Sequence, residues 1–181
     1  MKALTLYQPH ATLVALGAKT IETRSYPTSH RGSIAICAAK KSPNSWQKLA
    51  DAGLTTMPPH NAFSEELENS CGLLLGGPEA GLPNLATLPP GVIVALATLV
   101  DVRPCMIWGD PESYALAESE RAFGVYGSGR YAWFFEEILP LRPPYVPVSG
   151  HQRLWNLATD DYLAALDLAG PPTSYTRGPY G

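Results

Sequence analysis

The chain has 181 residues, of which 45% are hydrophobic and 16% are charged, and its formal net charge is −3. This composition supplies enough apolar side chains for one packed domain and argues against a disordered chain. The sequence shows no signal segment, in which a cationic start would be followed by an apolar run, and no apolar run long enough to span a bilayer. We therefore expect a soluble, cytoplasmic protein with no membrane partner.

Three residue types narrow the class of protein further. The 18 prolines, about twice the usual share, predict many turns and rigid loops rather than long helices. The three cysteines include no C-x-x-C pair, and the four histidines show no metal-ligand spacing. We therefore expect no disulfide framework, no metal and no cofactor.

The charges are distributed unevenly along the chain. Residues 1–48 contain seven lysines and arginines and a single acid, Glu22, which gives a net charge of +6. Residues 49–181 contain six arginines and fifteen acids, a net charge of −9. Such segregation is typical of a binding surface for an anionic ligand. The alternative is that the two parts of the sequence do not form two separate surfaces.

In chain order, the first part of the sequence alternates between strands and helices. Pro9 suits the first turn of a helix, and Gly17 is a good residue to end it. Apolar runs bounded by glycine or proline predict the strands. We expect a strand at Lys2–Leu6, a helix at Pro9–Leu16, a strand at Thr20–Arg24, a loop at Ser25–Arg31, a strand at Gly32–Ala39 and a helix from Ser42 to about Ala52.

The second part opens with a long segment rich in proline and glycine, residues 54–90, which we interpret as an insertion or a lid around a short helix at Phe63–Asn69. The longest apolar run of the chain follows it and predicts a central strand. The further elements that we expect are strands at Gly91–Val102, Arg130–Leu141 and Leu154–Leu157, helices at Glu112–Phe123 and Thr159–Leu168, and a turn at Val146–His151.

These elements predict an α+β fold, a small mixed β-barrel of about five or six strands decorated by helices. One domain would cover residues 1–169, and residues 170–181 would form a C-terminal tail. The irregular lengths of the connections argue against a doubly wound sheet. The sequence has no G-x-G-x-x-G or G-x-x-x-x-G-K-[ST] motif between a strand and a helix, so dinucleotide and nucleoside triphosphate sites are not indicated.

The densest cluster of polar side chains lies in residues 17–32. Lys19 and Arg24 are suited to contact phosphates, the first as a mobile point charge and the second as a bidentate fork. Glu22 lies between these cations, which should keep it ionised, so it could accept a hydrogen bond from a base or act as a general base. The alternative is a structural ion pair between Glu22 and Arg24, which share one face of the predicted strand.

Further candidates for nucleic-acid binding follow this strand or lie far from it in the sequence. Tyr26 and His30 could stack on a nucleobase, and Arg31 could pair with a phosphate. Lys40 could extend a basic rim, and Arg153 is the best distal candidate to complete a basic cleft. The alternatives are a loop held by its own hydrogen bonds for the first three residues and a solvated strand end for Lys40.

Three motifs, in this order, resemble the ASCH domain family of the PUA-like superfamily. The hallmark of that family is G-x-K-x-x-E-x-R just after the first helix, and it is present here as Gly17-x-Lys19-x-x-Glu22-x-Arg24. It is preceded by Gln8-Pro9. The strand that begins at Gly91 and the closing segment from Pro147 to Trp155 are also similar to that family. The resemblance implies a β-barrel whose cleft lies beside the first helix and is lined by Gln8 and the hallmark residues.

The resemblance also implies a function, because family members are regarded mainly as modules that bind RNA. We therefore expect RNA or a modified nucleotide as the ligand. The alternative is a metal-independent hydrolase that acts on RNA or on an acylated nucleoside, with Glu22 as base and Lys19 beside the developing negative charge. In the amidohydrolase-like relatives a threonine nucleophile matches the position of Glu22, so that chemistry does not transfer to this chain. A third alternative is an adaptor that binds a protein partner through residues 54–90.

Overall fold

The computed structural model describes residues 1–41, 88–105, 120 and 123–173 of the chain. Several of the predictions above lie outside these residues. They are the helices at Ser42–Ala52 and Phe63–Asn69, most of the helix at Glu112–Phe123, most of the segment 54–90, and the end of the C-terminal tail.

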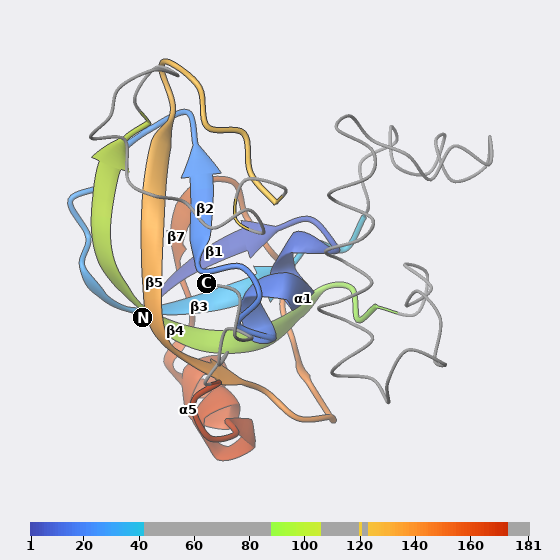
Figure 1. Cartoon of the computed structure of the whole chain (residues 1–181). Coiled ribbons are helices and arrows are strands. Elements are labelled where there is room, and N and C mark those ends of the chain that lie inside the picture. Colours follow the sequence, from blue (N-terminus) through green and yellow to red (C-terminus); the bar gives the residue numbers. More distant parts are fainter. Residues whose placement is uncertain (42–87, 106–119, 121–122, 174–181) are drawn as a thin grey trace, which may run out of the picture.

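One mixed sheet of seven strands organises the protein (Figure 1). The strands β1 (Lys2–Leu6) and β3 (Gly32–Ala38) are parallel, and every other pairing in the sheet is antiparallel. The long strand β4 (Val92–Pro104) changes register against β5 (Tyr131–Pro140) at two places, and such irregularities bend a strand. The order across the sheet is β2 (Ile21–Arg24), β5 (Tyr131–Pro140), β4 (Val92–Pro104), β3 (Gly32–Ala38), β1 (Lys2–Leu6) and β7 (Leu154–Asn156), and β6 (Val146–Pro147) also pairs with β4.

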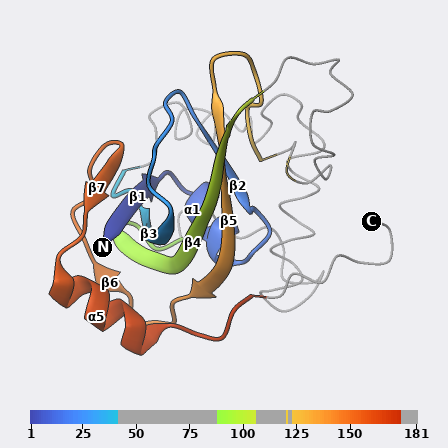
Figure 2. The ribbon, with the colours of Figure 1, turned by 90° about the vertical axis from the view of Figure 1, so that its left-hand side faces the viewer.

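The sheet curls into a half-barrel around the short helix α1 (His10–Ala15), and α5 (Thr159–Leu168) packs on the outside against β4 and β6 (Figure 2). Both faces of the central strands are therefore covered. This explains why the apolar residues of β1 and β3 do not alternate with polar ones. The expected α+β architecture, a curled mixed sheet with helices, is confirmed.

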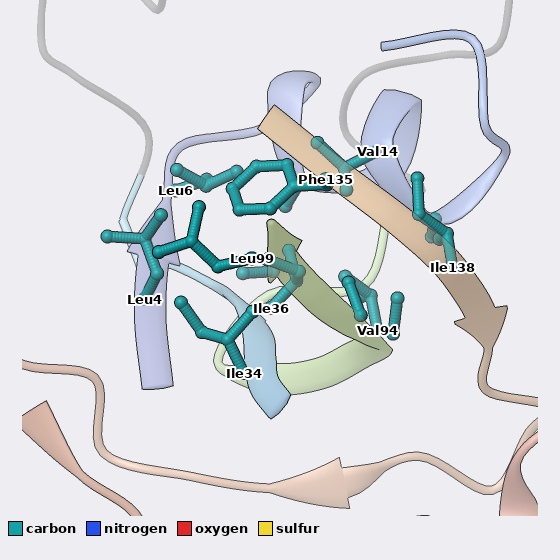
Figure 3. Packing of buried hydrophobic residues seen from close by; sticks show 14 of the residues in the cluster. Leu4, Leu6, Val14, Ile34, Ile36, Val94, Leu99, Phe135 and Ile138 are labelled. Carbon is teal, nitrogen blue, oxygen red and sulfur yellow. The ribbon is translucent and has the colours of Figure 1, made fainter. Parts of the chain in front are cut away.

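The two largest hydrophobic clusters share this sheet. The inner core lies inside the curl, and Figure 3 shows Phe135 of β5 between Leu6 of β1 and Val14 of α1. The outer core lies under α5 and includes Ala35, Cys37 and Ala165. Successive residues of a strand point to opposite faces. Strand β3 accordingly supplies Ile34, Ile36 and Ala38 to the inner core and Ala35 and Cys37 to the outer core.

The two ends of the sheet, β2 and β7, approach one another through side chains. A guanidinium N–H of Arg24, the last residue of β2, donates to the carbonyl oxygen of Thr5 in β1 at 3.0 Å. The guanidinium carbon of Arg153, which directly precedes β7, lies 5.3 Å from the centre of the Tyr26 ring. The open side of the curl is thus bridged by two arginines, and this junction lies next to the polar stretch noted in the sequence.

Most of the predicted elements are found within one or two residues of their expected ends, and α5 has the expected bounds. The predicted turn at Val146–His151 is wrong at its start, because Val146 and Pro147 form β6 and pair with Ile93 and Val92. The physical reason is visible in the burial of Val146 and Val148, which are both in the outer core while Pro147 between them is exposed. This alternation is typical of a strand.

The segment after α5 runs beside β5. There the backbone N–H groups of Gly170 and Thr173 donate to the carbonyl oxygens of Pro140 and Ile138.

Within the described part of the chain, no helix combines the length and the apolar character needed to span a membrane.

We expect the inner core to dominate the stability of the domain. Phe135 is 3% exposed, and Phe135→Ala should lower the free energy of unfolding by about 3–5 kcal/mol, because it removes apolar burial and leaves a cavity. Leu163 on α5 is 53% exposed, so Leu163→Ala should change the free energy of unfolding by no more than about 0.5 kcal/mol. Urea unfolding measures both values, and equal losses in the two variants would contradict this assignment of the core.

Candidate functional site

Lys19 lies in the short link between α1 and β2, and its side chain is fully buried. Its ammonium donates to the carbonyl oxygens of Ile21 at 2.5 Å and Phe123 at 2.9 Å, and it lies 3.4 Å from Oε2 of Glu22. An ammonium has three N–H donors, and these three acceptors account for all of them. A buried charge is very costly unless it is paired and hydrogen-bonded. The surrounding acceptors are therefore what allows a lysine at this position.

Two residues that the sequence did not single out complete this buried network. The backbone N–H and the hydroxyl of Thr20 both donate to Oε1 of Glu120, at 2.5 and 2.6 Å. Phe123, whose carbonyl accepts from Lys19, packs against Leu13 of α1. No motif in the sequence points to Glu120 or Phe123, because about one hundred residues separate them from their partners.

Glu22 lies between two cations on one face of β2. Its side chain is 13% exposed, and its carboxylate is 3.4 Å from both the Lys19 ammonium and Nε of Arg24. Burial alone would raise the pKa of Glu22, but the charges of Lys19 and Arg24 outweigh burial and hold the pKa below its ordinary value of 4.5. Glu22 is therefore ionised at neutral pH and can accept hydrogen bonds.

The predicted alternation along β2 is confirmed. Ile21 and Thr23 are buried, whereas Glu22 and Arg24 share the other face and remain partly accessible. The Arg24 side chain is 25% exposed, so part of the guanidinium that contacts Glu22 and the carbonyl oxygen of Thr5 can still be reached from outside.

Tyr26 follows β2 and is held between an indole and a guanidinium. Its ring meets that of Trp133 edge to face at 5.6 Å, and the Trp133 indole N–H donates to the carbonyl oxygen of Tyr26 at 3.3 Å. The guanidinium of the exposed Arg153 also lies over the Tyr26 ring, and Arg153 has a positive φ of 60°. This conformation is uncommon for a residue other than glycine and marks a constrained position. Burial is the main reason why the pKa of the Tyr26 hydroxyl is raised.

The closing motif of the chain is fastened to β1 at Thr5. The indole N–H of Trp155 donates to the hydroxyl of Thr5 at 3.1 Å. A methyl group added at Gly150 would lie 2.7 Å from the same hydroxyl oxygen, so a larger residue there would require Thr5 to shift. The hallmark and the closing motif therefore meet in space. We refer to Glu22, Arg24, Tyr26 and Arg153 together as the basic junction.

The charges around the basic junction add up to a positive value. Lys19, Arg24 and Arg153 contribute three positive charges, and the ionised Glu22 contributes one negative charge, a net of +2. The Lys19 side chain is fully buried, so its ammonium has no contact with solvent. Direct contact between Lys19 and a phosphate would require the ammonium to leave its present acceptors.

Gln8 and Lys40, which the sequence suggested as ligand contacts, have partners within the protein. The buried carboxamide of Gln8 donates to the carbonyl oxygen of Pro89 at 3.0 Å and accepts from the backbone N–H of Thr12 at 3.1 Å. It thus anchors the start of α1. The exposed Lys40 has its ammonium 3.4 Å from the hydroxyl of Ser149.

His30 and Arg31 have other partners than the basic junction. The guanidinium of Arg31 donates to the carbonyl oxygens of Thr28 and His30 and lies 3.3 Å from Oδ1 of Asp101. The alternative of a loop held by its own hydrogen bonds therefore describes Arg31. His30, whose Nε2 is 3.2 Å from the carbonyl oxygen of Ser33, lines an open hollow of about 530 Å³. Among the described residues, no group of His, Cys, Asp and Glu could hold a metal ion.

A pH dependence of stability follows from His10, at the start of α1. Burial, with the charge of Lys19 nearby, lowers the pKa of His10 from 6.5 to about 4. The unfolded chain then binds a proton at a higher pH than the folded protein does, so protonation favours unfolding. The free energy of unfolding should therefore fall as the pH decreases from 6.5 to about 4, and this fall should be smaller in His10→Gln.

Chemical unfolding of the parent protein and of His10→Gln at several pH values measures the effect. An unchanged slope in His10→Gln would contradict the proposed titration.

A search of the curated proteins found no match. The crystal structure of ASCH from Zymomonas mobilis is similar to this chain, with 14% sequence identity, a TM-score of 0.46, and coverage of 94% of this chain and 96% of the other. The crystal structure of a mutant of that protein is similar as well, with 13% identity, a TM-score of 0.47, and coverage of 93% of this chain and 98% of the other. At these values the likeness supports no argument about function.

The family assignment rests on a separate finding. The model of the ASCH domain matches residues 4–144, which is well over half of the chain and includes the hallmark G-x-K-x-x-E-x-R. The curled mixed sheet agrees with the PUA-like fold of such domains. The chain therefore belongs to the ASCH domain family.

Proposed function

We propose that this ASCH domain protein binds single-stranded RNA or a nucleotide-like ligand at the basic junction. One observation carries the proposal: the hallmark on β2 and the closing motif before β7 meet there, so that Arg153 lies over Tyr26 next to Arg24 and Glu22. Membership of a family whose members are regarded mainly as RNA-binding modules supports it.

The groups at the junction match the parts of a nucleotide. Arg24 and Arg153 can pair with phosphate oxygens as planar forks. The stacked pair of Tyr26 and Arg153 offers a flat surface on which a base can lie. Glu22 is ionised and can accept from an amino group on the edge of a base. The three donors of the Lys19 ammonium are already used, so Lys19 would act on the ligand only indirectly. Its positive charge would attract the ligand, and its contact with Glu22 would orient that carboxylate.

The proposal predicts salt-sensitive binding that depends on two arginines. Arg153→Ala and Arg24→Ala should each weaken binding of a labelled single-stranded RNA by about tenfold. Each should also reduce the slope of log affinity against log salt by about 0.7, because one phosphate contact is lost. Fluorescence anisotropy at several salt concentrations measures both quantities.

Arg142→Ala is the matched control, because Arg142 is exposed and follows β5, outside the basic junction. It removes the same charge and should leave the affinity nearly unchanged. The exposed Arg153 is the cleaner test variant, since Arg24 also fastens β2 to β1. No binding at low salt, or equal affinities of Arg153→Ala and Arg142→Ala, would refute the proposal.

A second candidate function is metal-independent hydrolysis of RNA or of an acylated nucleoside. The specific observation in its favour is that Glu22 is both ionised and partly accessible, so it could take a proton from water. Lys19 is poorly placed to stabilise a developing negative charge, because its ammonium has no donor to spare. Binding is therefore favoured over catalysis.

The hydrolase candidate predicts turnover in the presence of a chelator. Glu22→Gln should abolish this turnover because the amide is not a base, whereas Glu136→Gln, at an exposed position of β5, should retain it. Product formation from RNA and from an acylated nucleoside is followed by chromatography, with thermal unfolding as a check of folding. Full turnover in Glu22→Gln would show that Glu22 is not the general base. The absence of turnover in the parent protein would refute the hydrolase function.

A further inference from the structure

The open hollow lined by His30 lies at the start of β1 and the end of β7. Its volume of about 530 Å³ is within the range of sites that hold small organic ligands. The residues that line it come from four separate segments of the chain, and they are Met1, Lys2, His30, Ser33, Asn156 and Tyr162.

The side chains of the hollow are of the types that hold a nucleotide. Lys2 supplies a cation, and its ammonium donates to Oδ1 of Asn156 at 2.8 Å, which fixes it at this place. His30 and Tyr162 supply flat rings that can lie against a base. Ser33 and Asn156 add a hydroxyl and an amide that can bond to a sugar or to the edge of a base.

Two segments of the chain run from the basic junction to the hollow. Tyr26 and Arg153 touch at the junction, and His30 and Asn156 line the hollow. The loop from Tyr26 to His30 connects the two places on one side, and β7 with Arg153 before it connects them on the other. Three residues of extended chain from Arg153 to Asn156 span about 10 Å.

The register of β7 supports this continuity. Leu154 packs against the inner core, as Tyr26 does. Asn156 is two residues after Leu154 and therefore shares its face of the strand. It also stands opposite Lys2 in the pairing of β7 with β1, and the side chains of the two are hydrogen-bonded.

We propose that the hollow is a second contact point for the same RNA strand that binds at the basic junction. One nucleotide would lie at Tyr26 and Arg153, and a further one, with its phosphate at Lys2, would lie between His30 and Tyr162. This inference rests on the proposed function and makes it more specific, because the ligand is then an oligonucleotide rather than a single nucleotide. It also assigns a role to His30, which has no contact with the junction itself in the described part of the protein.

Two ligands distinguish the two contact points. A labelled oligouridylate of about eight nucleotides is long enough to reach both of them, whereas uridine monophosphate can occupy only one. The full-length protein is compared with Lys2→Ala, His30→Ala and the control Arg142→Ala. Anisotropy reports the affinity for the oligouridylate, and competition reports that for the monophosphate.

We expect Lys2→Ala and His30→Ala to weaken binding of the oligouridylate by about three- to tenfold relative to Arg142→Ala. Lys2→Ala should also reduce the slope of log affinity against log salt by about 0.7. Neither variant should change the affinity for uridine monophosphate, which would bind at the junction. If Lys2→Ala disturbs the folding of β1, His30→Ala still tests the inference. Thermal unfolding shows whether each of the two variants is folded.

The outcomes separate this inference from the proposed function. If the parent protein binds the oligouridylate and both variants bind it as Arg142→Ala does, the inference is overturned while the proposed function stands. If Lys2→Ala loses the monophosphate as well, the hollow is a primary site and the inference of a shared strand is overturned. If the parent protein binds neither ligand, both proposals are refuted.

Discussion

The buried ammonium of Lys19 is the constraint around which the candidate site is built. A charge inside the curl of the sheet requires acceptors on all sides, and the carbonyl oxygens of Ile21 and Phe123 with the carboxylate of Glu22 provide them. This requirement fixes the start of β2 and holds Phe123, from a distant part of the chain, against it. In physical terms the hallmark G-x-K-x-x-E-x-R is one ion-pair network, of which only the outer members, Glu22 and Arg24, reach solvent.

The position of that network depends on the packing of α1 against the inner core. Helix α1 has only six residues and would not be stable alone, so its position is set by packing against the inner core. The curl of the sheet then brings the residues after β2 next to those before β7. The basic junction is a consequence of this closure, because Tyr26 and Arg153 are far apart in the sequence and come from opposite ends of the sheet.

The charge distribution along the sequence does not predict where the cations lie in the structure. Among the described residues of the basic first part of the chain, 1–41, the cations do not form one basic patch, since Lys19 is buried, Arg31 pairs with Asp101 and Lys40 lies beside Ser149. The junction instead needs Arg153, from the acidic part of the chain. A charge count along the sequence does not show burial or pairing, and these two properties decide which cations a ligand can meet.

The sequence by itself determined every strand of the described part except β6, the helices α1 and α5, the two faces of β2 and the family motif. Hydrophobic periodicity and the glycine or proline residues that end an element act over a few neighbouring residues, so they can be recognised in the sequence. Only the tertiary structure decided that Lys19 is buried, that Phe123 accepts from Lys19 and Glu120 from the neighbouring Thr20, and that Tyr26 meets Arg153. These partners are about one hundred residues apart or more. Their contacts arise from the closure of a curled sheet, and no local pattern of residue types encodes that closure.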